Sequence, residues 1–424
     1  MGFSTLNEWL EFQQGINPKE IDLSLDRVQT LYNKLQINIP EKNVFLIGGT
    51  NGKGTTTSIL EQLFHKKGYK TGAFTSPHLT QYNERVRINL NNSFDQDWVS
   101  AFEIIEAVRG DVSLTYFEFS TLAAFQILSN HDCDAWFIEV GLGGRLDATN
   151  IIESSVSVLT SIAMDHEEWL GDSIDKIAKE KVGIAKRNRP LIFGDVVAVD
   201  VIQEGSLEKG SELRKKGEEF NGRIDQGHYS FNGVHQSIEE IVLPKSWGDG
   251  EIDNLTTALA AMEANEQFFP TRDLLQEIID EFILPGRFEL LDLHHRWILD
   301  VAHNPSAAEN LRQRIDRSKI NSDFSMIFSM MKDKHLELYL NAFKDLVDTW
   351  IICEMKTERS FRVKQIESKM NNMGIDNIYC ARSPLDAIKT LEKNVGLSNN
   401  VIVSGSFELV GPIREFLFNS QGKI

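Results

Sequence analysis

A glycine-rich segment of this chain has the composition of a phosphate-binding loop. It reads Gly48-Gly-Thr-Asn-Gly-Lys-Gly-Thr-Thr56 and lies between a short apolar run and a helical pattern. Closely spaced glycines let backbone N–H groups surround phosphate oxygens, and a helix start adds the positive end of its dipole. Lys53 can reach terminal phosphates, and Thr55 or Thr56 offers a hydroxyl to a metal ion. The spacing departs from GxxxxGK[ST] by one inserted glycine, so a simple strand–helix turn is the alternative.

Further charged side chains follow other apolar runs. Glu139, in EVGLGGRLDATN, is a carboxylate suited to Mg²⁺, although a capping or ion-paired acid would also fit. Arg145 in the same motif could hold an anion or form a surface ion pair. His166, in SIAMDHEE, is either a metal ligand or an ordinary hydrogen-bonded residue. Asn83-Glu-Arg-Val-Arg87 places two cations close together.

The elements that must position these residues are strands of a parallel sheet. Near-continuous apolar runs at 44–47, 135–138 and 156–162 suit strands buried on both faces. Between them, apolar residues of 59–64 share one helical face, and Gly68 predicts the end of that helix. Because the polar motifs follow the strands, we expect them at the sheet's carboxyl edge, where open α/β sheets bind ligands.

The same pattern restarts after about residue 290. Apolar runs recur at 297–299, 324–328, 350–353 and 401–403. We therefore predict an α/β chain with a large P-loop-type parallel-sheet domain, residues 1–286, and a smaller C-terminal Rossmann-like α/β domain, residues 287–424. Residues 203–250 are rich in Gly, Glu and Lys with weak periodicity, and we expect irregular or short β structure there.

Composition narrows the function classes. The chain has 424 residues, 62 acidic and 44 basic, giving a net charge of -18, which argues against a nucleic-acid surface. No apolar stretch approaches the ~18 residues of a membrane span, and the start shows no secretory signal. The cysteines Cys133, Cys353 and Cys380 are widely spaced, so we expect a reducing, cytoplasmic setting, with the first two buried.

Taken in order, eleven motifs resemble those of the bacterial bifunctional dihydrofolate synthase/folylpolyglutamate synthase family, within the Mur ligase superfamily. The motifs are IDLSLDRV, GTNGKGTT, TSPHL, NERVRIN, TYFEFSTLAAF, EVGLGGRLDATN, TSIAMDHEEWLG, EKVGIAK, LPGRFE, LDVAHNP and SGSF. They cover nearly the whole chain, and GTNGKG[ST] is the superfamily's own form of the phosphate loop. Ser24 stands where the family has glycine.

The resemblance implies a role for each group of residues. It implies ATP contacts at Asn51, Gly52, Lys53, Gly54, Thr55, Asn254, Arg287, Asp300 and His303. It implies two Mg²⁺ ions held by Ser76, Glu139, His166 and Lys181, the lysine carried as a carbamate rather than as an ordinary helix-surface side chain. It implies dihydropteroate contacts at Ile21, Asp22, Leu23, Ser24, Thr115, Tyr116, Phe117, Glu118, Leu146, Asp147 and Ala148. Lys53, His166 and Lys181 would be catalytic.

The implied activity is ATP-dependent ligation of L-glutamate to dihydropteroate and to reduced folyl-(poly)glutamates, through an acyl phosphate, by a monomer. One alternative is folylpolyglutamate synthase activity alone. A second is another superfamily ligase, such as a cell-wall amino-acid ligase, which would need a UDP-sugar domain before the phosphate loop. A third is a nucleotide-binding regulatory module without ligation chemistry. ADP release that needs both a pteroate and L-glutamate would separate these alternatives.

Overall fold

A computed structural model describes residues 3–17, 22–320, 323–394 and 400–421. The chain forms two compact units, one of residues 1–243 and 251–280, the other of 244–250 and 281–424. A single division after residue 286 does not describe this arrangement, because 244–250 group with the second unit. Arginines of α11 (Pro305–Arg317) hold that segment: Arg314 Nε donates to the Ser246 carbonyl, and Arg317 donates to the Trp247 carbonyl.

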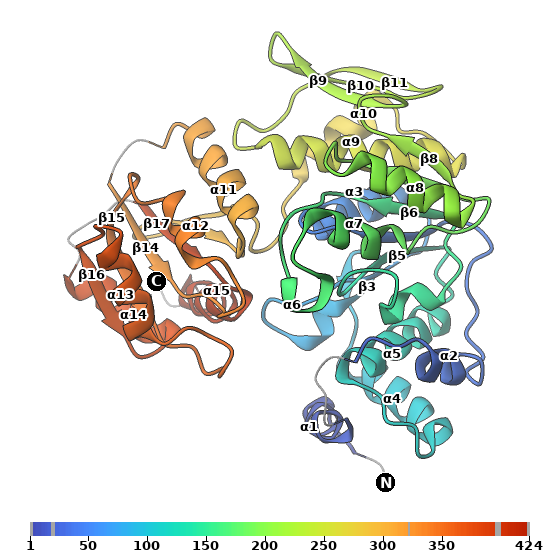
Figure 1. Cartoon of the computed structure of the whole chain (residues 1–424), viewed down its shortest axis with the longest axis horizontal. Helices are drawn as coiled ribbons and strands as arrows, with labels where there is room; N and C mark the ends of the chain where they lie inside the picture. Colours follow the sequence, from blue (N-terminus) through green and yellow to red (C-terminus); the bar gives the residue numbers. More distant parts are fainter. Residues whose placement is uncertain (1–2, 18–21, 321–322, 395–399, 422–424) are drawn as a thin grey trace. The chain divides into compact units, whose positions relative to one another are not determined.

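The first unit is built on a sheet of eight strands within the described residues, in the order β4-β3-β2-β5-β1-β6-β7-β8 (Figure 1). The strands from β2 to β8 in this order pair in parallel, and β3 and β4 add antiparallel pairings at one edge. The strands are β1 (Val44–Gly48), β2 (Thr71–Phe74), β3 (Val86–Ile88), β4 (Asn91–Asn92), β5 (Ala135–Glu139), β6 (Val156–Leu159), β7 (Pro190–Phe193) and β8 (Glu212–Lys215). The predicted parallel-sheet domain is thus confirmed.

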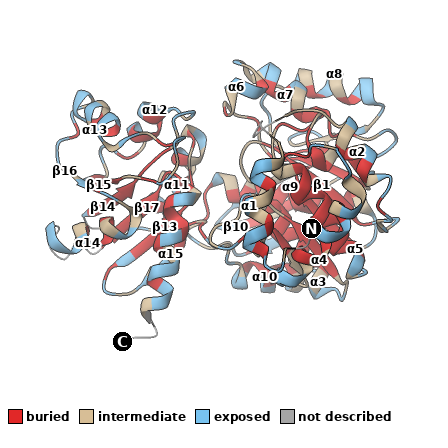
Figure 2. Cartoon of the chain, turned by 90° about the horizontal axis from the view of Figure 1, so that it is seen from below, coloured by how far each residue is buried: buried red, intermediate tan, exposed pale blue. Residues whose placement is uncertain are grey.

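The central strands are apolar throughout because helices cover both of their faces. On one face, Phe45 of β1 packs edge to face with Phe64 of α3 (Lys53–Lys66), their ring centroids 5.4 Å apart. On the other face, Trp136 of β5 stacks on Phe125 of α5 (Tyr116–Asn130) at 5.9 Å. Figure 2 shows β1 as buried, while exposed residues lie on outer helices such as α7 and α8. As predicted, the helix α3 ends before Gly68.

The remaining helices of the first unit frame the sheet. They are α1 (Leu6–Ile16), α2 (Asp26–Tyr32), α4 (Asp95–Arg109), α6 (Glu167–Leu170), α7 (Ile174–Val182), α8 (Val199–Lys209), α9 (Asp249–Asn265) and α10 (Arg272–Glu281), with 3-10 turns η1 (Tyr82–Arg85) and η2 (Ala148–Ile151). In the region expected to be irregular or short β structure, β9 (Asn221–Asp225), β10 (His228–Asn232) and β11 (Ser237–Ile241) form a small antiparallel sheet. Its start is helical instead, because α8 extends to Lys209.

The second unit is a separate α/β sheet, as predicted. Within the described residues its strand order is β12-β13-β17-β14-β15-β16, and every pairing is parallel except that of β12. The strands are β12 (Glu289–Asp292), β13 (Arg296–Asp300), β14 (Phe324–Phe328), β15 (Val347–Cys353), β16 (Ile378–Ala381) and β17 (Asn400–Ser404). Besides α11, the helices are α12 (Leu336–Asn341), α13 (Val363–Asn372), α14 (Pro384–Asn394) and α15 (Phe407–Gln421).

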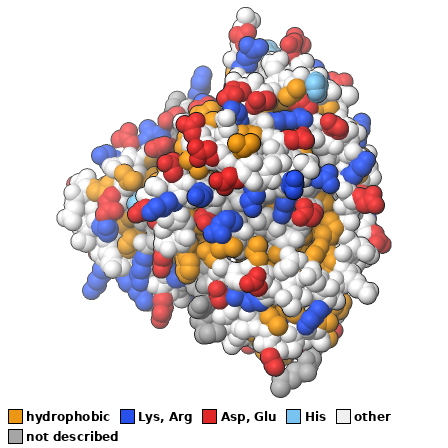
Figure 3. Space-filling model, turned by 45° about the vertical axis from the view of Figure 1, so that its right-hand side comes forward, with side chains coloured by type: hydrophobic (Ala, Val, Ile, Leu, Met, Phe, Trp, Pro, Cys, Tyr) orange, Lys and Arg blue, Asp and Glu red, His pale blue; other side chains and the backbone are white. Residues whose placement is uncertain are grey.

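The structure shows where the charged side chains and the cysteines lie, and it can be searched for membrane-spanning helices. Acidic and basic side chains are interspersed on the face drawn in Figure 3. Cys133 and Cys353 are buried free thiols, as predicted, and Cys380 is an exposed one. In the part of the chain that the structure describes, no helix is both long enough and apolar enough to span a membrane.

Candidate active site

Four chain segments with polar side chains leave the carboxyl edge of the first sheet. The phosphate loop follows β1, Thr75 and Ser76 follow β2, Glu139 ends β5, and residues 160–166 follow β6. Since β2, β5, β1 and β6 are parallel neighbours in this order, their carboxyl ends lie side by side. The sheet therefore brings these segments together where open α/β sheets bind ligands.

The phosphate loop is held in its shape by close contacts at two glycines. Gly49 has φ +141°, and a Cβ there would lie 1.9 Å from Thr160 Oγ1. Gly52 has φ +88°, and a Cβ there would lie 2.0 Å from Asn254 Oδ1. Both positions need glycine for lack of space as well as for backbone conformation. The contact also shows that Asn254, on α9, lies directly against the loop, as the family resemblance implies.

Two lysines meet at one carbonyl of this loop. Lys53, the first residue of α3, donates from Nζ to the Gly49 carbonyl at 3.1 Å and to the Thr50 carbonyl at 3.2 Å. Lys181, on α7, donates to the same Gly49 carbonyl at 2.9 Å. An ammonium group at this position attracts phosphate oxygens strongly. The chain thus provides the Lys53 ammonium, a second lysine amine, the glycine-rich backbone and a helix N-terminus, which together suit a triphosphate.

Lys181 is buried, with 4% of its surface exposed. Burial, together with the nearby Lys53 charge, lowers the pKa of Lys181 from 10.5 to about 7. Asp165 and Asp147 act in the opposite direction. Near neutral pH a large fraction of this amine is therefore uncharged, and an uncharged amine is the nucleophilic form of lysine.

Oxygen donors suited to Mg²⁺ lie beside the loop. Glu139 Oε2 accepts a hydrogen bond from the Ser76 backbone N–H at 3.2 Å, and a Cβ on Gly54 would lie 4.0 Å from the same oxygen. Among the described residues, no three His, Cys, Asp or Glu side chains are grouped as in a preformed metal centre. Mg²⁺ commonly takes one or two carboxylates and completes its shell with water and phosphate, so Ser76 and Glu139 fit this ion.

His166 lies at the start of α6 with φ +52°. Its backbone N–H donates to Asp165 Oδ1 at 2.9 Å, and its Nε2 is 4.0 Å from Asp165 Oδ2. The side chain is about one third exposed, which leaves the ring accessible. His166 therefore follows β6 at the expected edge, and its role as a metal ligand stays a prediction.

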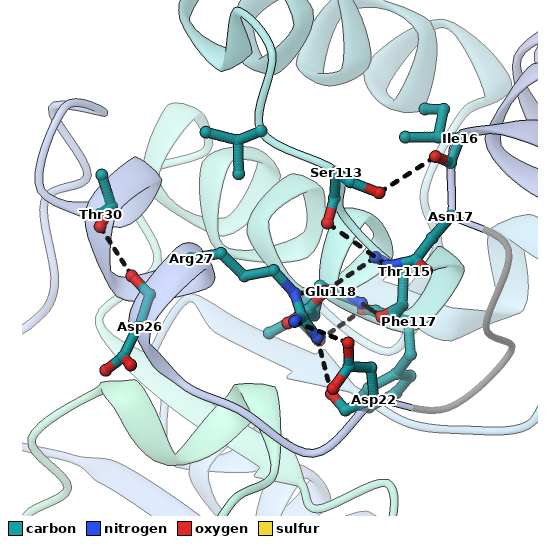
Figure 4. A network of polar contacts seen from close by, with 12 residues as sticks. Ile16, Asn17, Asp22, Asp26, Arg27, Thr30, Ser113, Thr115, Phe117 and Glu118 are labelled. Carbon is teal, nitrogen blue, oxygen red and sulfur yellow. Dashed lines mark hydrogen bonds and ion pairs between the residues drawn. The ribbon is translucent and has the colours of Figure 1, made fainter.

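A network of polar contacts joins two of the three segments expected to bind dihydropteroate (Figure 4). Arg27, on α2, donates from Nη1 to Asp22 at 3.0 Å and from Nε to Glu118 at 2.9 Å. Glu118 also accepts from the Thr115 backbone N–H at 2.8 Å. The other oxygen of Glu118, Oε1, is buried and has no hydrogen-bond partner among the described residues. A buried carboxylate oxygen of this kind needs a donor, which a ligand N–H could provide.

The side chain of Phe117, next to Glu118, reaches the edge of the sheet that carries Glu139. Phe117 stacks on Phe74, the last residue of β2, with centroids 6.1 Å apart. A Cβ on Gly141 would lie 2.3 Å from Phe117 Cζ, so this glycine allows the ring to approach the segment after β5. The segment that the resemblance assigns to the pterin thus adjoins the segment it assigns to the metal.

The third segment, Leu146 to Ala148, is fixed by Asp147. This buried carboxylate accepts from the backbone N–H of Leu142 at 2.8 Å and from that of Thr149 at 2.9 Å. Burial raises the pKa of the Asp147 carboxyl, and the hydrogen bonds it accepts oppose that shift. The following turn, η2, contacts both α2 and α5, so all three segments lie together. Ile21 lies outside the described residues.

In the second unit, the predicted nucleotide contacts gather around one aromatic ring. The Arg287 guanidinium lies 5.4 Å from the Phe407 ring centroid, and the His303 ring lies 6.0 Å from it. Asp300 ends β13, and its two oxygens accept from the backbone N–H groups of Phe288 and Ala302, both at 2.8 Å. Burial raises the pKa of Asp300, and the Arg287 and Arg314 charges oppose that shift.

For Arg145, the structure favours one of the two alternatives that the sequence left open. Arg145 has the surface role, since its Nη2 lies 2.9 Å from Glu180 and its side chain is nearly half exposed. Arg27, which links Asp22 to Glu118, was not singled out. Its only sequence signal is its place in the motif IDLSLDRV.

The site can now be compared with known proteins. Residues 47–261 match the Mur ligase middle domain, and residues 286–407 match the Mur ligase glutamate ligase domain. Escherichia coli dihydrofolate synthase/folylpolyglutamate synthase is 36% identical over 415 residues, which is 98% of this chain and 96% of that protein. The structure of Escherichia coli FolC in complex with DHPP and ADP superposes with a TM-score of 0.92 at 35% identity, covering 99% of both chains.

A further solved structure is that of a bifunctional folylpolyglutamate synthase/dihydrofolate synthase with Mn, AMPPNP and L-glutamate bound. Its TM-score is 0.88 at 30% identity, and the match covers 98% of each chain. The architecture and the phosphate loop are those of a Mur ligase. The chain belongs, within that superfamily, to the dihydrofolate synthase/folylpolyglutamate synthase family.

The buried Lys181 gives a pH dependence that can be measured. Because its pKa is about 7 in the folded state and 10.5 when exposed, the unfolded state binds more protons between these values. Stability should therefore rise from pH 7 toward pH 10, by ~2–3 kcal/mol at pH 9 from this group. Urea unfolding in CO2-free buffer at pH 7 and pH 9 would show the rise, and Lys181→Met should lack it. An equal rise in both proteins would contradict the prediction.

Proposed function

We propose that this protein is an ATP-dependent ligase that joins L-glutamate to dihydropteroate, giving dihydrofolate, and also extends reduced folyl-(poly)glutamates. The observation that carries this conclusion is the meeting of the phosphate loop, Glu139 and the segment 115–118 at one sheet edge. The Escherichia coli relative, at 36% identity, carries both activities in its name. This favours the bifunctional enzyme over folylpolyglutamate synthase alone and over other ligases of the superfamily.

The reaction that fits these residues has two steps. A carboxylate oxygen of the acceptor attacks the γ-phosphorus of ATP, the β–γ phosphoanhydride bond breaks, and ADP leaves. The amino nitrogen of L-glutamate then attacks the acyl carbon, the bond to the phosphoryl oxygen breaks, and phosphate leaves as the nitrogen loses a proton. Lys53 lies where it can stabilise negative charge on the phosphoryl oxygens throughout. No side-chain nucleophile is needed.

The metal and nucleotide contacts complete the assignment. Ser76, Glu139, His166 and a carbamate on Lys181 would hold Mg²⁺, which when bound neutralises phosphate charge. Arg287, Asp300 and His303 would contact the nucleotide from the second unit. We infer a monomer in a reducing cytoplasm, where the three cysteines would stay free thiols.

The first test concerns the cation in the phosphate loop. Lys53→Ala should lower turnover at least ~100-fold, a typical loss for a group that stabilises transition-state charge. The readout is ADP release that requires both dihydropteroate and L-glutamate. The matched control is Lys66→Ala in the same helix, an exposed lysine paired with Glu277. Unchanged turnover in Lys53→Ala would remove the loop from the mechanism, and ADP release without dihydropteroate would remove the proposed substrate.

The second test concerns the pterin segment. Asp22 is half-buried and binds Arg27, which also binds Glu118, so Asp22→Ala should disturb the pterin contacts. We expect KM for dihydropteroate to rise ~10-fold, with a smaller effect on extension of a folate that has its own glutamate tail to hold it. Asp26→Ala is the control, since that exposed carboxylate lies on the same segment. An equal loss in both reactions would make the segment structural.

We also propose that Lys181 carries a carbamate. The lysine is buried, partly uncharged near pH 7, and faces Asp165 and Asp147 as well as Lys53. Reaction of the amine with CO2 forms an N–C bond, releases one proton and supplies two oxygens of the kind that Mg²⁺ prefers. The carbamate nitrogen keeps one N–H, which can still donate to the Gly49 carbonyl.

Carbon-13 NMR of the protein in labelled bicarbonate tests this modification directly. A slowly exchanging carbamate signal is expected for the wild type, strengthened by Mg²⁺, and is expected to be absent from Lys181→Ala. Lys186→Ala is the control, because Lys186 is a second lysine whose pKa burial lowers, to about 8. A wild type without the signal, or a signal lost only in Lys186→Ala, would contradict the carbamate at Lys181.

A further inference from the structure

Arg85, at the end of η1, is a buried cation without a carboxylate partner in the part of the chain that the structure describes. Only 7% of its surface is exposed. Its Nε donates to Nδ1 of His78 at 3.0 Å, and an imidazole carries no negative charge. Among the described residues, no carboxylate lies within ion-pair distance of the guanidinium. Buried charges in proteins are normally paired, so this one calls for an anion from outside the chain.

A neighbouring arginine, in contrast, forms an ion pair with a buried carboxylate of the chain. Arg87 lies two residues further along, in β3, and its Nη2 is 2.6 Å from Glu61 Oε2. Glu61 is itself only 1% exposed, and Arg87 also donates to Thr75 Oγ1 at 3.2 Å. The motif NERVR thus contains one arginine with an internal countercharge and one without. The difference indicates that Arg85 serves a ligand and Arg87 serves the fold.

The surroundings of Arg85 are aromatic. Its guanidinium lies 5.1 Å from the ring centroid of Tyr82 and 5.8 Å from that of Tyr116. Tyr116 belongs to the segment expected to bind the pteroate, next to Phe117, which reaches Gly141. A guanidinium beside aromatic rings keeps its N–H groups for hydrogen bonds in its own plane, and it is in this plane that arginine binds a carboxylate.

A backbone hydrogen bond also places Arg85 close to Ser76 and Glu139, the residues expected to hold Mg²⁺. Its carbonyl accepts from the Thr75 N–H at 2.8 Å, and the next residue, Ser76, donates its own N–H to Glu139. Arg85 therefore lies between the pteroate segment and the residues that would hold Mg²⁺. A dihydropteroate whose ring occupies the first region must direct its single carboxylate toward the second.

We propose that Arg85 binds the acceptor carboxylate of dihydropteroate, the group that is to be phosphorylated. This inference rests on the proposed function and adds to it the residue that recognises and orients the reacting carboxylate. A bidentate pair would hold both oxygens, one of which must be presented to the γ-phosphorus. Lys53 and Lys181, near the same edge, donate to the Gly49 carbonyl instead, and Arg87 is paired with Glu61.

The test compares dihydropteroate with its carboxamide, which has the same shape without the charge. Dissociation constants of both are measured by titration calorimetry in the presence of AMPPNP, for the wild type, Arg85→Gln and Arg85→Lys. The control is Arg189→Gln, which removes an exposed cation from the same unit. We expect the wild type and the control to prefer the carboxylate by ~10- to 100-fold, the range of a charge-assisted hydrogen-bond pair.

Arg85→Gln should lose this preference while its affinity for the carboxamide changes less than ~2-fold. Arg85→Lys should keep part of the preference, and if Arg85→Gln does not fold, an unchanged preference in Arg85→Lys overturns the proposal. It is also overturned by equal weakening of both ligands or by a wild type that binds them equally. Normal ligation with an intact preference in Arg85→Gln refutes only the role of Arg85. A wild type without dihydropteroate-dependent ADP release refutes the proposed function.

Discussion

The candidate site depends on the Gly49 carbonyl, the single oxygen to which Lys53 and Lys181 both donate. Two amines at one acceptor repel each other when both are charged, so this arrangement persists only while one is neutral or an anion lies nearby. The loop that carries this oxygen is tied to the end of β6. Thr50 N–H donates to the Ser161 carbonyl at 2.7 Å, and Thr160 Oγ1 donates to the Asn51 carbonyl at 2.6 Å. The positions of the cations are therefore set by the sheet itself.

Much of the fold could be predicted because its elements are dictated locally. A strand buried on both faces must be apolar along its length, so the runs at 44–47 and 135–138 are visible in the sequence. The boundary between the two units, in contrast, depends on contacts between residues far apart in the sequence. Residues 244–250 join the second unit through Arg314 and Arg317, which lie more than sixty residues later. Local patterns contain no information on such distant partners.

The candidate site divides in the same way. Glu139 and Asp300 could be found because each ends a strand, and Lys53 because it lies in a glycine-rich loop between a strand and a helix. The order of the motifs identified the remaining residues. The sequence could not show whether each charged side chain is buried or exposed, and whether it has a partner of opposite charge. Arg145 and Arg85 are equally conspicuous as cations in a motif, yet one is an exposed ion pair and the other is buried without a carboxylate. Only the packing around a charge decides whether the fold has already neutralised it.

The central position of β1 affects how often different parts of the site open to solvent. This strand lies between β5 and β6, and its five residues are all buried. Its amide protons can exchange with solvent only when the whole unit opens, whereas those of the segment around Asp22 and Ser24, outside any helix or strand, are released by small local fluctuations. The strand that leads into the phosphate loop thus has the stability of the whole unit, while the segment around Asp22 and Ser24 has only that of a surface segment. The surface segment can therefore rearrange without disturbing the strand.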